Sequence, residues 1–182
     1  MRYLFIILSL LFSNSVFSAA KKPDELGVYP PYLFSILKLI EWPSIGNDAV
    51  KFCVIGEPFL VPAIEHYAED KTIHLLPVTA ERKEYRDDIS ECHAVYIGSL
   101  VRGDVTEYID SFNKAPIVIF GHRDGFLEQG GMINFVVVEE KLRFELNVDN
   151  ISAAQLTPGD VLTSLSTTLK DQGSNTAENS GL

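Results

Sequence analysis

The first pattern of helical spacing in the chain lies shortly before a Glu-Trp-Pro sequence. Four apolar residues fall at i, i+3, i+4 and i+7, which places them on one face of a helix; they are Leu33, Ile36, Leu37 and Ile40. Pro43 cannot continue a helix, because it lacks the backbone N–H and clashes with the preceding turn. The pattern therefore predicts a short helix over residues 32–40 that ends in Glu41-Trp42-Pro43.

Short apolar runs then alternate with stretches of helical periodicity. Strands are predicted at residues 51–55, 72–78, 94–97 and 116–120. A helix is predicted after Pro58, a charged connector over residues 80–91, and a second helix after Asp104, which is a suitable N-cap. Strands at helical spacing are typical of βαβ units, so we expect a parallel sheet with helices on both faces.

The pattern changes after Gly121. The runs 132–138 and 142–147 are separated only by residues 139–141, and so short a connector requires an antiparallel hairpin. Residues 148–169 are predicted to be mostly helical, interrupted by Pro158-Gly159, with an apolar face made of Val161, Leu162, Leu165 and Leu169. The expected fold is a single α/β domain with a mixed, mostly parallel sheet flanked by helices, and with a C-terminal antiparallel hairpin and helix.

The two ends of the chain differ from this middle part. Arg2 precedes an apolar run that extends from Leu4 to Phe12, and Ser18-Ala19-Ala20 supplies small residues for cleavage. We therefore interpret residues 1–20 as a cleavable signal peptide, since the run is shorter than the roughly 20 residues that span a bilayer. Residues 21–170 form the predicted domain, for which we expect no direct membrane insertion, and the polar residues 171–182 are predicted to be a disordered tail.

Charge and cysteine content narrow the possible partners. The formal net charge is −10, and the basic residues lie among acidic ones, which argues against nucleic acid as a partner. Cys53 and Cys92 are the only cysteines, and export to an oxidising compartment favours a disulfide between them. The alternative is a pair of buried free thiols. We predict no metal site, because the four histidines have no tight ligand spacing with the cysteines.

Sequence signatures of catalysis and cofactor binding are missing. The chain contains no G-x-G-x-x-G, P-loop, G-x-S-x-G or H-E-x-x-H pattern, so we expect neither an enzyme nor a cofactor. Cys92 and His93 are neighbours that would point to opposite faces of a strand, a poor arrangement for proton transfer. Glycines end three predicted strands, at Gly56, Gly98 and Gly121. Because open α/β sheets bind ligands beyond the carboxyl ends of their strands, a small-ligand cleft there is the alternative hypothesis.

The most unusual stretch of the chain extends from Gly125 to Phe135. It reads G-F-L-E-Q-G-G-M-I-N-F and places Gln129 and two adjacent glycines immediately before a predicted strand. Glycines permit backbone conformations that are closed to other residues, and glutamine both donates and accepts hydrogen bonds. The stretch is interpreted either as a connector that switches the chain from parallel to antiparallel pairing, or as a direct contact to a ligand or partner.

This stretch resembles the YfiR family of periplasmic proteins, which share an opening helix ending in E-W-P, the block G-F-x-x-Q-G-G-M-I-x-F, and R-F-E-[IL]-N. The corresponding residues here are Glu41-Trp42-Pro43, Gly125 to Phe135 and residues 143–147. The resemblance extends from about Tyr32 to Leu165. The chain departs from the family in its opening helix, in the start of its last helix, and in a hairpin connector that lacks glycine.

The resemblance implies a periplasmic, non-enzymatic regulator. It would restrain an inner-membrane diguanylate cyclase through the periplasmic region of that protein, and so lower cyclic di-GMP and biofilm formation. An outer-membrane lipoprotein is implied as a second partner, and a homodimer as an oligomeric state. A small-ligand module that feeds another envelope sensor or transporter is the competing hypothesis. The candidate contact residues are Gly125, Phe126, Gln129, Gly130, Gly131, Asn134, Arg143, Glu145 and Asn147.

Overall fold

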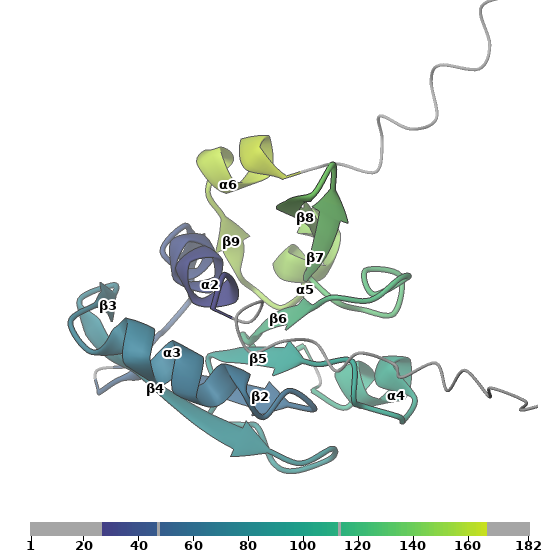
Figure 1. Cartoon of the computed structure of the whole chain (residues 1–182), viewed down its shortest axis with the longest axis horizontal. Helices are drawn as coiled ribbons and strands as arrows, with labels where there is room; N and C mark the ends of the chain where they lie inside the picture. The colour runs from purple at the N-terminus through teal and green to yellow at the C-terminus, as the bar shows by residue number, and fades with distance from the viewer. Residues whose placement is uncertain (1–26, 47, 113, 167–182) are drawn as a thin grey trace, which may run out of the picture.

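A computed structural model describes residues 27–46, 48–112 and 114–166 of the 182-residue chain (Figure 1). The predicted signal peptide, the predicted tail and Leu169 lie outside these residues. The helices are α2 (Tyr29–Leu37), α3 (Leu60–Ala68), α4 (Val105–Asp110), α5 (Val148–Ala153) and α6 (Asp160–Leu165). The strands are β1 (Ile40–Glu41), β2 (Val50–Ile55), β3 (Thr72–Ile73), β4 (Leu76–Lys83), β5 (Ala94–Ile97), β6 (Val118–Gly121), β7 (Ile133–Val138), β8 (Lys141–Leu146) and β9 (Thr157–Pro158).

Seven of these strands form one mixed sheet in the order β3-β4-β2-β5-β6-β7-β8. The pairs that join β4, β2, β5, β6 and β7 are all parallel, while β3 and β8 pair antiparallel at the two edges. The sheet is strongly twisted, so that β8 stands steeply to β4 (Figure 1). The predicted fold class, a mostly parallel α/β sheet with a C-terminal antiparallel hairpin, is confirmed.

One face of the sheet carries the aromatic core. Phe52 and Phe120 stack with ring centroids 5.8 Å apart, and Phe120 stacks on Phe135 at 6.1 Å. Helix α2 covers these rings, because Tyr29 lies edge-on to Phe135 at 5.1 Å and to Tyr96 at 5.9 Å. Helix α3 packs beside α2 on the same face. Phe34 of α2 and Tyr67 of α3 meet with ring centroids 5.0 Å apart.

The opposite face lies one residue out of phase along each strand. It carries Cys53 of β2 and Gly121 of β6, the neighbours of Phe52 and Phe120. Helix α4 and the segment from Gly125 to Gly131 cover this face. A Cβ atom placed on Gly130 would lie 3.0 Å from Cγ2 of Ile109 in α4. The expectation of helices on both faces is therefore correct.

The strand predicted at residues 72–78 is instead divided between two antiparallel strands, the two-residue β3 and the start of the eight-residue β4. His74 and Leu75 form the turn between them with φ angles of 49° and 68°. Neither residue is a usual choice for this conformation, so the sequence signals no turn. The turn is held from outside, because the imidazole Nε2 of His74 lies 2.9 Å from the carbonyl oxygen of Ile40, beyond α2.

The charged connector predicted over residues 80–91 begins too early, because β4 continues to Lys83. Its strand is set by parallel pairing with β2, in which Glu81 lies opposite Cys53 and Lys83 opposite Ile55. Charged residues are common near sheet edges, where they discourage pairing with other chains. The charged residues at the end of β4 therefore show no apolar strand pattern, and only the pairing with β2 specifies this part of the strand.

Helix α4 begins at the predicted cap. The Asp104 side chain accepts a hydrogen bond from the Glu107 backbone N–H at 3.1 Å. We expect Asp104→Ala to lower the free energy of unfolding by about 1 kcal/mol, measured by urea denaturation, because this N–H loses its acceptor. Asp110→Ala is the matched control. It removes an exposed carboxylate from the C-terminal end of the same helix and should cost nothing, so equal losses in both variants would contradict a capping role.

Candidate functional site

Phe126, a predicted contact residue, lies in the core. Its side chain is fully buried, and its ring covers two glycines. A Cβ atom placed on Gly121 would lie 2.6 Å from that ring, and one placed on Gly131 would lie 2.3 Å from it. Gly125 has a φ of 68°, which suits the turn that leads into this ring. Phe126 and Gly131 are thus structural residues, in agreement with the interpretation of this stretch as a connector, while Gly125, Gln129 and Gly130 are at least partly accessible.

The predicted polar face of the hairpin is mostly engaged within the domain. Asn134 is buried, accepts a hydrogen bond from the Arg123 backbone N–H at 3.0 Å, and donates one to Glu145 at 3.0 Å. Asn147 caps α5 by accepting from the Asn150 N–H at 3.0 Å. The structure brings Asn134 and Glu145 together as expected for facing strands. Arg143 is the one exposed residue among the three predicted polar-face residues, because Glu145 and Asn147 are partly buried.

The loops at the carboxyl ends of the parallel strands pack against one another. A Cβ atom on Gly98 would lie 2.5 Å from the carbonyl oxygen of Gly56 and 2.8 Å from Cβ of Glu57, whose side chain is buried. Burial raises the pKa of Tyr96 far above its ordinary value, so its hydroxyl stays neutral, and it forms a hydrogen bond with Nδ1 of His122 at 2.7 Å. Side chains and backbone therefore occupy the position between Gly56 and Gly98 where a cleft was the alternative hypothesis.

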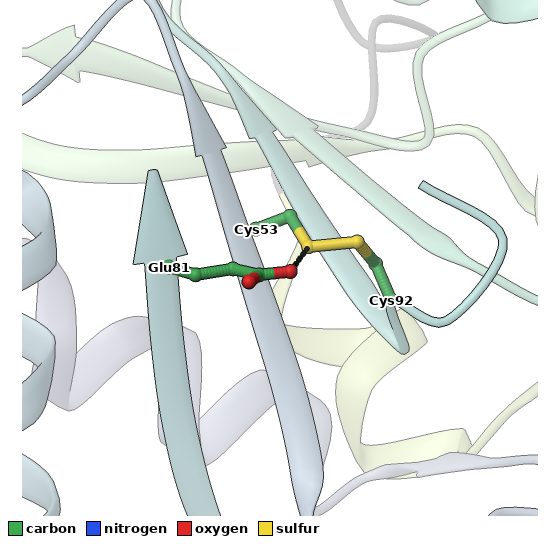
Figure 2. Close-up of side chains that lie close together, drawn as sticks. All are labelled: Cys53, Glu81 and Cys92. Carbon is green, nitrogen blue, oxygen red and sulfur yellow. Dashed lines mark hydrogen bonds between the residues drawn. A yellow bond between two sulfur atoms is a disulfide. The ribbon is translucent and has the colours of Figure 1, made fainter. Parts of the chain in front are cut away.

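The predicted disulfide joins Cys53 and Cys92, and the carboxylate of Glu81 lies beside it (Figure 2). Glu81 Oε1 is 3.5 Å from Cys53 Sγ and 3.1 Å from Nζ of Lys83. The side chains of Cys53, Glu81 and Cys92 are close enough to one another to surround a metal ion. Metal ions bind cysteine in its thiolate form, however, and the sulfur atoms of a disulfide are not thiolates. With the bridge intact, only one carboxylate remains, and it is already paired with Lys83.

An apolar groove lies between α2, β8 and α6. It has a volume of about 280 Å³. Ten residues line it: Pro31, Tyr32, Ser35, Ile36 and Leu39 around α2, Leu142, Arg143 and Phe144 of β8, and Leu162 and Leu165 of α6. Tyr32 and Leu165 remain 38% and 62% exposed, so the groove and its rim present apolar surface to solvent. We call these ten residues the α2–β8–α6 groove.

Each element contributes to the α2–β8–α6 groove through its local pattern. Leu33 and Leu37 of α2 point into the core, which turns Tyr32 toward the flank of the helix. In β8, alternation places Leu142 and Phe144 on one face. Helix α6 is only six residues long and buries Leu162 alone, so Leu165 remains at the rim.

The apolar face predicted for residues 161–169 is only partly buried in the described residues. Val161 and Leu165 are 56% and 62% exposed, and only Leu162 is buried. The physical reason lies just before α6, where Thr157 and Pro158 form β9 and pair with β1. This pairing fixes the position of the chain at the start of α6. Sequence reasoning missed nine of the ten groove residues as a site. The apolar spacing of α6 was recognised, but it was not interpreted as part of a site.

Comparison with known families identifies the group to which this chain belongs. Residues 30–167 match the model of the DUF4154 family, described as YfiR/HmsC-like. The chain is a member of the YfiR/HmsC-like family. No curated protein matches the sequence.

Among solved structures, the YfiR/HmsC-like chain is similar to a conserved domain protein from Vibrio cholerae. The TM-score is 0.54 at 11% sequence identity, and the match covers 79% of this chain. The chain spans 59% of the length of that protein. At this identity the likeness supports the fold alone.

The family motifs of this YfiR/HmsC-like domain serve its architecture. Trp42 of the E-W-P motif is half-buried, and its ring lies edge-on to His74 with centroids 5.7 Å apart. Phe144 of the R-F-E-L-N motif is buried beneath α2. Within residues 27–46, 48–112 and 114–166, no helix has the length and apolar character needed to cross a bilayer. The motifs thus serve the fold, and two residues of one motif, Arg143 and Phe144, also line the α2–β8–α6 groove.

Proposed function

We propose that this chain is a periplasmic regulator that restrains an inner-membrane diguanylate cyclase by direct contact, and thereby lowers cyclic di-GMP and biofilm formation. The observation that carries the proposal is the exposed α2–β8–α6 groove in a YfiR/HmsC-like domain. Exposed apolar surface bordered by an arginine and a tyrosine is typical of protein interaction sites. The groove offers Tyr32 at its rim with Leu165 beside it, and Arg143 lies on the other face of β8.

Two further features support this function. The Cys53–Cys92 disulfide suits an oxidising compartment such as the periplasm, to which the predicted signal peptide would direct the chain. The packed loops around Gly56 and Gly98 favour a protein-contact role over the small-ligand alternative. An outer-membrane lipoprotein that sequesters the regulator, and a homodimer, are further partners within the same proposal.

Leu165→Glu tests the proposed contact. Leu165 is 62% exposed, so the substitution should leave the fold intact while placing a charge in the α2–β8–α6 groove. Loss of an apolar anchor typically weakens a protein interface by about 1–3 kcal/mol, or roughly tenfold or more in affinity. A deletion strain should contain raised cyclic di-GMP. The unchanged chain should restore the low level, and the Leu165→Glu chain should not.

Leu100→Glu is the matched control. Leu100 is 60% exposed and lies in the loop after β5, outside the groove, so this variant should restore low cyclic di-GMP as the unchanged chain does. Equal restoration by Leu165→Glu and Leu100→Glu would rule out the groove as the contact. Unchanged cyclic di-GMP in the deletion strain, with no cyclase recovered by crosslinking in the periplasm, would rule out the function itself.

A further inference from the structure

Strand β8 is an edge of the sheet, and its register shows which of its backbone groups point outward. Glu139 and Glu140 form a two-residue turn with φ angles of 50° and 61°, and Val138 pairs with Lys141 across it. In such a hairpin the two residues that flank the turn form the first hydrogen-bonded pair, and the pairs then alternate. The N–H and C=O groups of Lys141, Arg143 and Glu145 are therefore bonded to β7.

The backbone groups of Leu142, Phe144 and Leu146 consequently point away from β7. Two contacts agree with this register. The Asn147 N–H donates to the Met132 carbonyl oxygen at 2.9 Å, which continues the same alternation, and the Tyr32 hydroxyl approaches the Leu142 carbonyl oxygen from outside at 3.4 Å. In the described part of the chain, no strand lies beyond β8, and Tyr32 supplies the one hydrogen bond to this outer edge.

This open edge borders the α2–β8–α6 groove. Leu142 and Phe144 contribute side chains to the groove, and their outward N–H and C=O groups belong to the same strand edge. An unpaired edge is a template for a further strand, with main-chain hydrogen bonds providing affinity and alternate side chains entering pockets. The edge and the apolar groove beside it together have the features that bind an extended segment.

We propose that the β8 edge accepts one extended segment of the partner protein as an additional strand of the sheet. The proposal rests on the function proposed above and specifies how the partner binds. Every second residue of the segment is apolar and enters the α2–β8–α6 groove. The intervening residues lie beside Arg143 and Lys141 on the other face of β8.

Charge specifies the segment further. Lys141 and Arg143 are exposed, and neither forms an ion pair with any residue that the structure describes, in a protein whose formal net charge is −10. Opposite charges on neighbouring strands stabilise pairing, while like charges oppose it. The partner segment should therefore carry an acidic residue at a position that faces Arg143.

Backbone hydrogen exchange tests strand addition directly. The probe is a capped octapeptide in which valine alternates with threonine and one threonine is replaced by aspartate. In the free protein the Phe144 and Leu146 amides should exchange faster than those of Arg143 and Glu145, and the peptide should slow the first pair by at least about tenfold. The same peptide, N-methylated on the amides that face β8, should give no protection. Equal binding of both peptides would overturn the proposal.

Leu142→Pro supplies an independent test in the protein. Proline removes an outward N–H and leaves the hydrogen bonds to β7 in place, which is the position where an edge strand tolerates it. Leu142→Val, which keeps the N–H, is the control. We expect Leu142→Pro to bind the peptide at least about tenfold more weakly than Leu142→Val, which accounts for the change in the groove side chain. Equal binding by both variants would overturn the proposal, and should Leu142→Pro fail to fold, the exchange measurement decides.

The remaining outcomes separate this proposal from the proposed function. The Phe144 and Leu146 amides could be protected in the full chain and lose this protection when the chain is truncated after Ser166. That result would assign the edge to the protein's own C-terminal segment. Protection that rises with protein concentration alone would assign it to a second copy. Either result overturns the proposal. If no peptide protects the edge but Leu165→Glu still abolishes control of cyclic di-GMP, strand addition is wrong and the proposed function stands.

Discussion

Replacing Phe126 with alanine is expected to lower the free energy of unfolding by about 3–5 kcal/mol. The ring is fully buried and fills the space above Gly121 and Gly131, where a Cβ atom on either glycine would collide with it. No other side chain can move into this space without shifting β6 or the glycine segment, so the cavity would remain largely open. Urea denaturation followed by circular dichroism measures the change.

Two variants control for this effect. Phe59→Ala removes the same atoms from a side chain that is 63% exposed, and it should change stability by no more than about 0.5 kcal/mol. Phe126→Leu retains much of the volume and should fall between alanine and the unchanged chain, which gives a reading even if Phe126→Ala does not fold. A loss below about 1 kcal/mol in Phe126→Ala would show that this ring does not hold the segment in place.

Replacing both Cys53 and Cys92 with alanine is expected to cost about 4 kcal/mol. The bridge closes a loop over a sequence separation of 39 residues, and in the chain-entropy model its removal restores that freedom to the unfolded chain. No helix connects β4 to β5, and residues 84–92 lead from one strand to the other. The bridge attaches the end of this segment to β2.

The comparison that isolates the bridge uses a reductant. Reduction should lower the urea midpoint of the unchanged chain toward that of the double variant, and it should leave the double variant unaltered. Glu81→Gln is a further control, because it removes the neighbouring charge and keeps both sulfur atoms bonded. Its effect should stay within about 1 kcal/mol, as for other partly exposed ion pairs. Equal midpoints for the oxidised chain and the double variant would contradict a stabilising bridge.

The proposed regulator would combine these two rigid features with one open surface. Phe126 and the disulfide fix the face of the sheet that carries α4, while the opposite face is closed by α2 and α3 except at β8. A rigid sheet that is free at its β8 edge suits strand addition, because the receiving strand loses little entropy on binding. The domain would therefore bind a partner at β8 without changing its own conformation.

Several local features could be predicted from the sequence because neighbouring residues decide them. Asp104 was recognised as a cap, and the helical face containing Leu33 and Leu37 is buried as its spacing indicated. The short connector at Glu139-Glu140 required a hairpin, which the structure contains. The disulfide was predicted from the two cysteines and the predicted signal peptide, and it is confirmed.

The contact residues could be predicted only in part. Asn134 and Phe126 are polar or aromatic residues in an unusual sequence, yet both are buried, because β6, β8 and the glycine segment close over them. Arg143 remains exposed as expected. The turn at His74 and Leu75 was missed because contacts of His74 with the carbonyl oxygens of Leu37 and Ile40, rather than turn-forming residues, hold it.

The sequence by itself determined the order of the elements, the faces that they bury and the disulfide, since the period of apolar residues sets which side of a helix or strand avoids water. Only the tertiary structure decided that α2, β8 and α6 border a common groove. Tyr32 and Leu142 are 110 residues apart, and nothing in their local patterns indicates that they meet. Their proximity follows from the sheet order and from the pairing of β1 with β9, which place the start and the end of the domain side by side.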